Sequence, residues 1–327
     1  MSGIKISHSA NEKYQNSPRS WYLHYSLRLR QEKLGSPLCF GGAVDEALNA
    51  MLEEKVIGAT DVPDPYAMFE RKWTHNEYNG EVLDLRTSEK VKWSKADYDE
   101  SILLEKDHAL IEAKNDPSWV SMRRKGIMML DSYAKFVMPH IKEVKSIQSF
   151  IDIDGEGEDM VIGYADFIAV FELDKDAVAL IEDKELRATY EALEQYNGKT
   201  ILFDNKTSSN KYKDDSVEQS PQLGTYIESP IAEEHGVEHA GYIVMPKKIR
   251  KKKSPRVPIQ IIIGDVSQDI IDGVFEEYAD TIEGIKLGNF PCTGGCKANF
   301  FGCTYDGYCK SGGKDMTGLV KVKKGSR

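Results

Sequence analysis

GYADFIAVFE at residues 163–172 and TILFDNKTSS at residues 200–209 are the two stretches that decide the fold. Both are apolar runs rich in β-branched residues, which is typical of buried strands, and Asp166 and Asp204 interrupt them. Side chains two residues apart on a strand point to the same face, so Asp204 and Lys206 are expected to project together. The sequence therefore predicts two strands that carry two carboxylates and one lysine.

The rest of the chain alternates between strand and helix patterns. Short apolar segments predict further strands at 147–153, 241–245 and 257–263. Apolar residues at helical spacing predict helices at 21–30, 43–54, within 119–145 with an end near Pro139, and at 182–196, 221–229 and 266–284. We therefore expect an α/β fold, one compact domain in three parts: a mostly helical part (1–145), an α/β core (146–265), and a C-terminal helix, cysteine cluster and basic tail (266–327).

Composition places few limits on function. Of the 327 residues, 40% are hydrophobic and 29% are charged, as in an ordinary soluble globular protein. No apolar run is long enough to span a membrane, and the polar N-terminus lacks the apolar core of a signal peptide, so a cytoplasmic location is expected. The net charge of −10 argues against a protein coated in nucleic acid, but it is compatible with a local basic patch.

Two carboxylates and a lysine on strands are groups that hydrolysis of a phosphodiester bond can use. Two carboxylates can hold a hard divalent cation through oxygen. The cation polarises the phosphate and lowers the pKa of a bound water, while a lysine orients that water or offsets charge on the phosphate. The alternative is that Asp166, Asp204 and Lys206 only cap strands or face solvent, as residues of such short motifs commonly do.

Four of the five cysteines lie near the C-terminus, with the spacing Cys292-x3-Cys296-x6-Cys303-x5-Cys309. In a cytosolic chain such clustering indicates metal binding rather than disulfides. Four thiolates fit either a tetrahedral zinc or a [4Fe–4S] cluster, and only the first pair has the spacing of a zinc knuckle. Four unliganded cysteines are the remaining alternative.

Basic residues gather in PKKIRKKKSPR, between the predicted strands at 241–245 and 257–263. A hairpin loop of this charge in an otherwise acidic chain is a candidate contact for a DNA backbone. The alternative is a solvated loop tip. The residues concerned are Lys247, Lys248, Arg250, Lys251, Lys252, Lys253 and Arg256.

Six short motifs follow one another along the chain. SHSANEKYQNSPRSWYLHY is similar to an opening Ser-x-Ser and Cys-Pro segment, and FGGAVDEALNAMLE to a Gly-x-x-x-His helix start. GYADFI, DNKTSS and SPQLGTYIES are similar to a Gly-x-x-Asp strand, an Asp-x-Lys-Thr strand and a Gln-x-x-x-Tyr helix, and FPCTGGCKANFFGCTYDGYC to a terminal cysteine cluster. In this order they resemble the PD-(D/E)xK nuclease superfamily, in its RecB-like branch, which includes phage exonucleases and CRISPR-adaptation nucleases.

The resemblance implies a fold and a metal site. The fold would be a mixed central sheet of the restriction-endonuclease-like type flanked by helices, with a helical N-terminal part and a C-terminal cysteine clasp. Asp166, Asp204 and the backbone carbonyl of Asn205 would hold Mg²⁺ or Mn²⁺, and Lys206 would be the catalytic lysine.

The resemblance also assigns a role to one helix. Gln222 and Tyr226 lie one helical turn apart, and they would face the DNA or the active site. For Tyr226 the alternative is ordinary helix packing, since aromatic residues at helical spacing are usually part of a core.

Two positions depart from the family pattern. The helix-start histidine, a metal ligand in many members, corresponds to Asp45, which is expected to be either an oxygen ligand or a helix N-cap or first-turn acid. The early cysteine before Pro18 is replaced by Ser17, so the fourth ligand of the family's iron–sulfur clasp must come from elsewhere. Cys292 is the expected substitute and Cys39 the alternative. The resemblance favours [4Fe–4S] over zinc, in a structural role.

A competing motif occurs in ALIEDKE, where Glu182 and Lys184 form an E-x-K pair. The residues after it look helical, and no Gln-x-x-x-Tyr pair follows at the expected distance. Asp204 and Lys206 are therefore preferred as the catalytic pair, which makes residues 173–199 an insertion between two catalytic strands.

The resemblance implies a Mg²⁺- or Mn²⁺-dependent deoxyribonuclease, expected to be an exonuclease of recombination, repair or phage DNA metabolism in a bacterial or phage-infected cell. Its partners would be DNA and other recombination or replication proteins. An inactivated nuclease fold that serves as a DNA-binding scaffold is the alternative; the two aspartates and the lysine argue against it, and the missing histidine argues for it. An iron–sulfur redox protein is disfavoured, because the chain has no G-x-G-x-x-G dinucleotide fingerprint.

Overall fold

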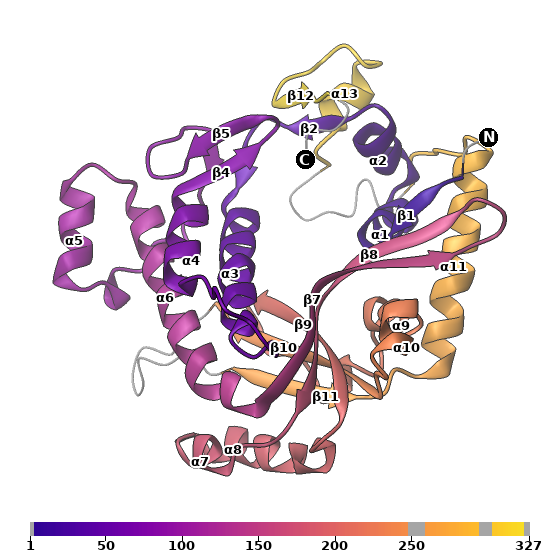
Figure 1. Cartoon of the computed structure of the whole chain (residues 1–327). Helices are drawn as coiled ribbons and strands as arrows, with labels where there is room; N and C mark the ends of the chain where they lie inside the picture. The colour runs from indigo at the N-terminus through magenta and orange to yellow at the C-terminus, as the bar shows by residue number, and fades with distance from the viewer. Residues whose placement is uncertain (1–2, 248–258, 294–302, 324–327) are drawn as a thin grey trace.

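The computed structural model describes residues 3–247, 259–293 and 303–323. At its centre a mixed sheet has the order β1 (Lys5–Ser7), β8 (Met160–Phe171), β9 (Thr200–Ser208), β10 (His239–Pro246) and β11 (Gln260–Gly264), and β7 (Ile141–Asp154) also pairs with β8 (Figure 1). The β1–β8 and β9–β10 pairs are parallel. The β7–β8, β8–β9 and β10–β11 pairs are antiparallel. The predicted mixed central sheet is confirmed.

The strands agree with the sequence pattern where apolar residues are continuous. The apolar runs predict strands at 160–171 and 200–204; β8 has the first of these bounds, whereas β9 continues to Ser208, and β10 exceeds its predicted range of 241–245 at both ends. β7 begins at Ile141, so one long strand crosses the expected limit of the helical part. β1 was not expected, since the three residues KIS carry a single apolar side chain.

Helices cover both faces of the sheet. On one face, α3 (Ser36–Glu53), α4 (Pro65–Thr74) and α6 (Pro117–Phe136) pack in a core that includes Phe203 and Ile243. On the other face, α9 (Pro221–Ile227) and the start of α11 (Gln268–Lys286) pack against Leu202 and Val244. Leu202 and Phe203 are neighbours on β9 and face opposite ways, as strand geometry requires. Figure 1 shows the sheet between these two helical layers.

The remaining elements are short. They are α1 (His8–Asn16), α2 (Pro18–Trp21), a π-helical turn (Tyr22–Ser26), β2 (Leu29–Gln31), β3 (Leu34–Gly35), β4 (His75–Tyr78), β5 (Glu81–Asp84), β6 (Val91–Lys92), α5 (Glu105–Glu112), α7 (Lys175–Ala179), α8 (Lys184–Glu191), α10 (Pro230–Glu234), α13 (Asp306–Lys310) and β12 (Leu319–Lys321), with 3-10 turns at Glu100–Ile102, Met138–His140, Ala192–Tyr196 and Asp214–Ser216. The helix expected at 21–30 is wrong, because this stretch divides into the π-helical turn and β2. In the described ranges, no helix is both long and apolar enough to cross a membrane.

Candidate active site

The candidate active site lies where the two central strands separate. β7 follows one edge of β8 along its whole length, so β1 and β9 share the other edge and leave residues 163–166 between them. The last paired residues of β8 and β9 are Phe167 and Phe203. Asp166 and Asp204 occupy the next position on each strand, so the two acids face each other at the point of separation.

Hydrogen bonds hold the two strands together at this point. The backbone N–H of Asn205 donates to Oδ2 of Asp166 at 2.7 Å, and the side chain of Gln148, on β7, approaches Oδ1 at 3.5 Å. The side-chain oxygen of Asn205 accepts from the hydroxyl of Tyr133, on α6, at 3.3 Å. Asp166 is therefore fixed by its neighbours on both sides of β8.

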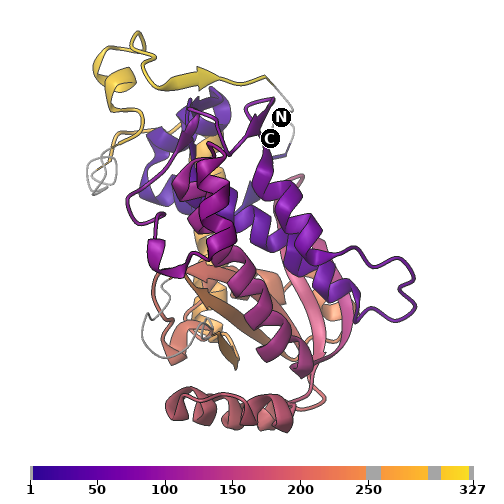
Figure 2. The same cartoon turned by 90° about the vertical axis from the view of Figure 1, so that its left-hand side faces the viewer.

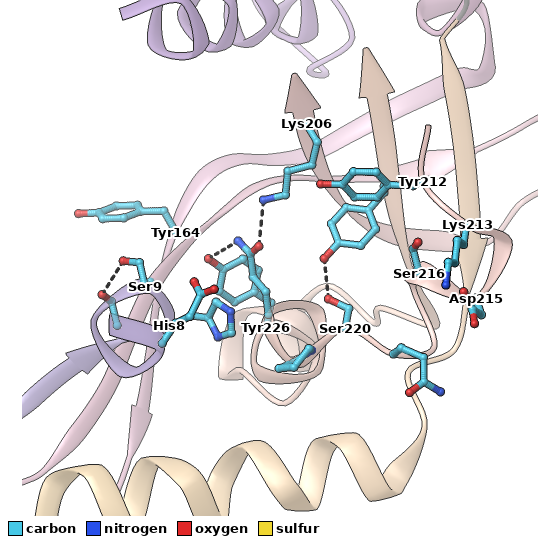
Figure 3. Close-up of a pocket in the computed structure, with 17 residues that line it drawn as sticks. His8, Ser9, Tyr164, Lys206, Tyr212, Lys213, Asp215, Ser216, Ser220 and Tyr226 are labelled. Atoms are coloured by element: carbon cyan, nitrogen blue, oxygen red, sulfur yellow. Dashed lines mark hydrogen bonds between the residues drawn. The ribbon is translucent and has the colours of Figure 1, made fainter. Parts of the chain in front are cut away.

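α9 carries the polar side chains that meet β9. The side chain of Ser220 caps this helix by accepting from the N–H of Leu223 at 3.1 Å, which fixes where the helix starts. Gln222 then accepts from Nζ of Lys206 at 2.9 Å and donates to Oδ1 of Asp204 at 3.1 Å. Its amide also lies 3.0 Å from the hydroxyl of Tyr226 (Figure 3).

Lys206 completes this network. Its ammonium lies 2.6 Å from Oδ2 of Asp204, so Gln222 contacts both members of an ion pair. Desolvation by burial acts to lower the pKa of Lys206, but the negative charges of Asp204 and Asp166 outweigh it and raise this pKa, so the lysine is a cation. The sequence prediction that Asp204 and Lys206 project together is confirmed.

α3 brings a third carboxylate to the site. Burial, followed by the negative charge of Asp204, raises the pKa of Asp45 to about 6. Asp45 lies in the middle of the Ser36–Glu53 helix, so the alternative that it is an N-cap or first-turn acid is wrong. Asp45 therefore lies near Asp204 and Asp166, and its role as a metal ligand stays a prediction.

The three carboxylates oppose one another electrostatically. Burial is the largest cause that raises the pKa of Asp166 well above its ordinary range, and the charges of Asp204 and Asp45 raise it further. Burial also raises the pKa of Asp204, although Lys206 and Gln222 act against this. A site that collects buried carboxylates at such a cost is suited to a cation, which removes the repulsion between them.

The oxygen donors of Asp166, Asp204 and Asn205 are of the kind that binds a hard divalent cation. Carboxylate and carbonyl oxygens are the ligands that Mg²⁺ and Mn²⁺ prefer. In the conformation of the described residues, no three His, Cys, Asp or Glu side chains are arranged to hold a metal ion. Asp166 and Asp204 would supply two carboxylates and Asn205 one backbone carbonyl, and water would complete the ligand set.

A cavity of about 980 Å³ opens beside this network. Lys206 lies between its two ends (Figure 3): Ser9 and Tyr164 are at one end, and Tyr212, Lys213 and Asp215 are at the other. The cavity is large enough for a nucleotide, and it leads to the Lys206–Gln222 contact.

Sequence reasoning missed three residues of the site, of which only His8 lines the cavity. His8, at the start of α1, lines it beside Tyr226, and burial lowers the pKa of this imidazole. Tyr133 and Gln148 reach the site from α6 and β7, which carry no recognisable motif. The segment SHSAN contained a signal for His8, since a polar residue at a helix start in a family motif is a candidate site residue.

The competing E-x-K pair lies elsewhere. Glu182 precedes α8 and Lys184 begins it, and both side chains are exposed. In Figure 1 and Figure 2, α7 and α8 lie at the lower edge of the molecule, below the sheet. This pair therefore does not share the buried site of Asp204 and Lys206.

Three cysteines of the C-terminal motif line one cavity of about 370 Å³: Cys292, Cys303 and Cys309. Cys296 lies outside the described residues. Cys39 packs in the core around α3, where its thiol contacts the carbonyl of Gly35, which makes it a poorer candidate for a fourth ligand than Cys292.

The segment that holds Ser17 lies against this cysteine cavity. Arg19 and Ser20 line it, and the N–H of Arg19 donates to the carbonyl of Pro291. Thr293 donates to the carbonyl of Asn16 at 3.2 Å. The position that corresponds to the family's early cysteine thus lies beside the C-terminal cysteines.

Most of the predicted basic loop lies outside the described residues, namely Lys248, Arg250, Lys251, Lys252, Lys253 and Arg256. Lys247 is described; its ammonium lies 6.0 Å from the centre of the Phe40 ring, and burial lowers its pKa. The flanking strands β10 and β11 pair as an antiparallel hairpin, as expected.

Comparison with known families identifies the class of protein. The sequence model of the PD-(D/E)XK nuclease superfamily matches residues 5–310. Because this match covers most of the chain, the protein belongs to the PD-(D/E)XK nuclease superfamily. Members of this superfamily are typically metal-dependent nucleases, which supports a hydrolase activity. A search among curated proteins gives no match.

Proposed function

We propose that this protein is a metal-dependent DNA nuclease that hydrolyses phosphodiester bonds. One observation carries the proposal: Asp166, Asp204 and Lys206 meet at the end of the β8–β9 pairing, beside a cavity that opens on Lys206. Nuclease chemistry needs carboxylates for a cation and a positive group for phosphate charge, and this site supplies both.

Each side chain has a role in this proposal. Asp166, Asp204 and the carbonyl of Asn205 hold Mg²⁺ or Mn²⁺, with Asp45 as a further ligand. When bound, the cation supplies charge that polarises a phosphate oxygen and lowers the pKa of a water molecule. Lys206 donates to the attacking water or to a phosphate oxygen.

Two residues of α9 orient this lysine. Gln222 holds the Lys206 ammonium through its side-chain oxygen, at 2.9 Å. The hydroxyl of Tyr226 lies 3.0 Å from the amide nitrogen of Gln222, so it fixes the orientation of that amide. Both side chains also border the cavity, where they are within reach of a bound DNA strand.

The type of nuclease and the process in which it acts are inferred from the resemblance to RecB-like nucleases. We infer an exonuclease of recombination, repair or phage DNA metabolism, with DNA as its substrate and other recombination or replication proteins as partners. The basic loop at Lys247–Arg256 joins β10 to β11, and we assign it to the DNA backbone.

The cysteine motif is proposed to bind a structural [4Fe–4S] cluster, with zinc as the alternative. The support is that Cys292, Cys303 and Cys309 line one cavity, although in the conformation of the described residues they form no ready-made metal site. Ser17 occupies the position of the family's early cysteine, and Cys292 would supply the fourth ligand in its place. The cluster would hold the C-terminal segment together, away from the carboxylates.

One experiment tests the activity directly. Purified protein is incubated with labelled linear double-stranded, circular and single-stranded DNA, with Mg²⁺, with Mn²⁺ and with EDTA. Cleavage that needs the cation and spares circular DNA supports an exonuclease, whereas cleavage of circles makes the enzyme an endonuclease. Binding without cleavage under every condition contradicts the proposal and supports the alternative, an inactive nuclease fold that binds DNA as a scaffold.

A further inference from the structure

Two large aromatic side chains stand exposed side by side on the β7–β8 hairpin. Phe150 on β7 is directly opposite Tyr164 on β8, and their ring centroids are 5.3 Å apart at an interplanar angle of 59°. Phe150 is 46% exposed and Tyr164 is 48% exposed. Ile151 and Ala165, the next residue on each strand, are fully buried.

The exposure of this pair is unexpected for its position. On a sheet with one solvated face, the outward positions that alternate with buried ones are usually polar. A single exposed aromatic residue needs no explanation, but two rings in contact form an apolar patch, and such patches commonly mark binding sites.

The aromatic pair borders the candidate active site. Tyr164 lines the same cavity as Lys206 and Gln222, and Figure 3 shows it at the rim beside Ser9. Tyr164 also precedes Asp166 by only two residues on β8. Residues 163–166 belong to the part of β8 that neither β1 nor β9 pairs with, which leaves this rim open.

We propose that Phe150 and Tyr164 form a base-stacking platform for an unpaired nucleotide of single-stranded DNA. This inference rests on the proposed nuclease function and names its substrate class. Aromatic side chains bind single strands by stacking on the flat faces of bases, with little sequence preference. In a duplex those faces are already covered by the neighbouring base pairs, so the platform favours an unpaired strand.

The platform and the catalytic groups act on neighbouring parts of one strand. The base lies on Phe150 and Tyr164, while the adjoining phosphate lies over Asp166 and Lys206. The strand then continues through the cavity toward Tyr212. Stacking on a rigid strand pair fixes the position of the phosphate without any contact that reads the base sequence.

Binding without cleavage tests the platform. A fluorescein-labelled single strand of mixed sequence is titrated in EDTA, with fluorescence anisotropy as the readout. Tyr164→Ala and Phe150→Ala are each expected to weaken binding by about tenfold, in the range measured for loss of one stacked base. Tyr164→Trp should bind at least as well as the wild type. Tyr98→Ala is the matched control, since Tyr98 is also an exposed tyrosine, at 40%.

A second probe separates stacking from general damage. The same strand with abasic sites has the phosphates but no bases, so the alanine variants should bind it as the wild type does. Equal loss on both probes, or no loss on either, overturns the platform. The alternative is that Phe150 and Tyr164 bind a second copy of this chain, and sedimentation of each variant tests it. A wild-type dimer that becomes a monomer in Phe150→Ala would also overturn the platform.

The same experiments distinguish a failure of the platform from a failure of the nuclease proposal. If the wild type cleaves DNA with Mg²⁺ or Mn²⁺ but the alanine variants bind the single strand normally, only the platform fails. If the variants lose binding as expected but the wild type cleaves no DNA, the platform stands and the nuclease proposal fails.

Discussion

The backbone N–H of Asn205 donates a 2.7 Å hydrogen bond to Oδ2 of Asp166, just beyond the last paired residues of β8 and β9. This bond joins the two strands after their ladder has ended. It fixes the Asp166 carboxylate and, through the rigid peptide plane, the backbone beside Asp204. The two proposed metal ligands are therefore held in register by the main chain and not only by packing.

We predict that Asp204→Ala and Lys206→Ala each reduce cleavage by at least about 10²–10³-fold, the loss seen when one group that stabilises developing charge is removed. Gel assays with a labelled strand measure the rate, and anisotropy in EDTA measures binding. DNA binding should survive in both variants, since the cavity and the basic loop remain. Undiminished turnover in either variant would show that the substituted residue is not needed for catalysis.

Glu182→Ala is the matched control for this pair. Glu182 belongs to the competing E-x-K motif, and it is exposed just before α8. We expect its cleavage rate to equal that of the wild type. A large loss in Glu182→Ala together with normal activity in Asp204→Ala would reverse the assignment.

Asp45→Asn should raise the metal concentration needed for half-maximal cleavage, because the variant loses a charged oxygen near Asp204. A titration of Mg²⁺ and Mn²⁺ at constant pH gives this value. The wild type should also need more metal as the pH falls through about 6, where a proton competes for Asp45. An unchanged titration in the variant would exclude Asp45 from the metal site.

The metal-free protein should lose stability as the pH rises from about 4 to 6. Burial and the charge of Asp204 raise the pKa of Asp45 from 3.8 to about 6, so the folded state holds its proton more tightly than the unfolded state. The free energy of unfolding then decreases with pH through this window. Urea unfolding in EDTA should show Asp45→Asn more stable than the wild type at pH 7–8, by about 1–2 kcal/mol.

Asp61→Asn is the control for this stability series, because Asp61 is an exposed carboxylate. Its unfolding curve should follow the wild type at every pH. A wild-type curve that is flat between pH 4 and 6 would contradict the electrostatic cost assigned to the site. Adding Mg²⁺ should stabilise the wild type more than Asp45→Asn, since ligand binding to the folded state shifts unfolding.

Neutralising several basic residues between Lys247 and Arg256 should weaken DNA binding and flatten its dependence on salt concentration. Each phosphate contact that is lost removes about one unit from the slope of log K against log salt. Anisotropy at several salt concentrations measures that slope. An unaltered slope would mean that the loop is only solvated.

Protein purified without oxygen is expected to be brown and to contain four iron atoms per chain, as a [4Fe–4S] cluster requires. Elemental analysis decides between the metals. One zinc per chain would make the site a zinc clasp, and the absence of both metals would mean that the thiols are free. Cys292→Ser should lose the iron, while Cys39→Ser, the control, should keep it. The opposite pattern would make Cys39 the fourth ligand.

The strands and the contact between Asp204 and Lys206 could be predicted because their signals are local. Apolar runs define β8 and β9, and the alternation of side chains along a strand places Asp204 beside Lys206. The match of Gln222 to a family motif then placed α9 beside them. Each of these features depends on residues that are neighbours in the sequence, so a single sequence is enough to predict it.

Features that depend on distant parts of the chain could not be predicted in this way. β1 pairs with β8 across more than 150 residues, and its three residues carry no strand pattern of their own. Gln148 and Tyr133 reach Asp166 and Asn205 from elements without a motif. Their side chains are ordinary in sequence, and only the tertiary packing makes them part of the site.

The pairing of β1 with β8 also bears on the order in which the site can form during folding. Ile6 pairs with Val161 on β8, and Asn11 accepts a hydrogen bond from Thr281 on α11, so this side of the cavity is built from residues that are far apart in the sequence. Closing such long loops is slow, because entropy is lost before the contacts form. His8 therefore takes its place in the cavity wall only after α1 has packed against α11, so this wall depends on completed tertiary folding.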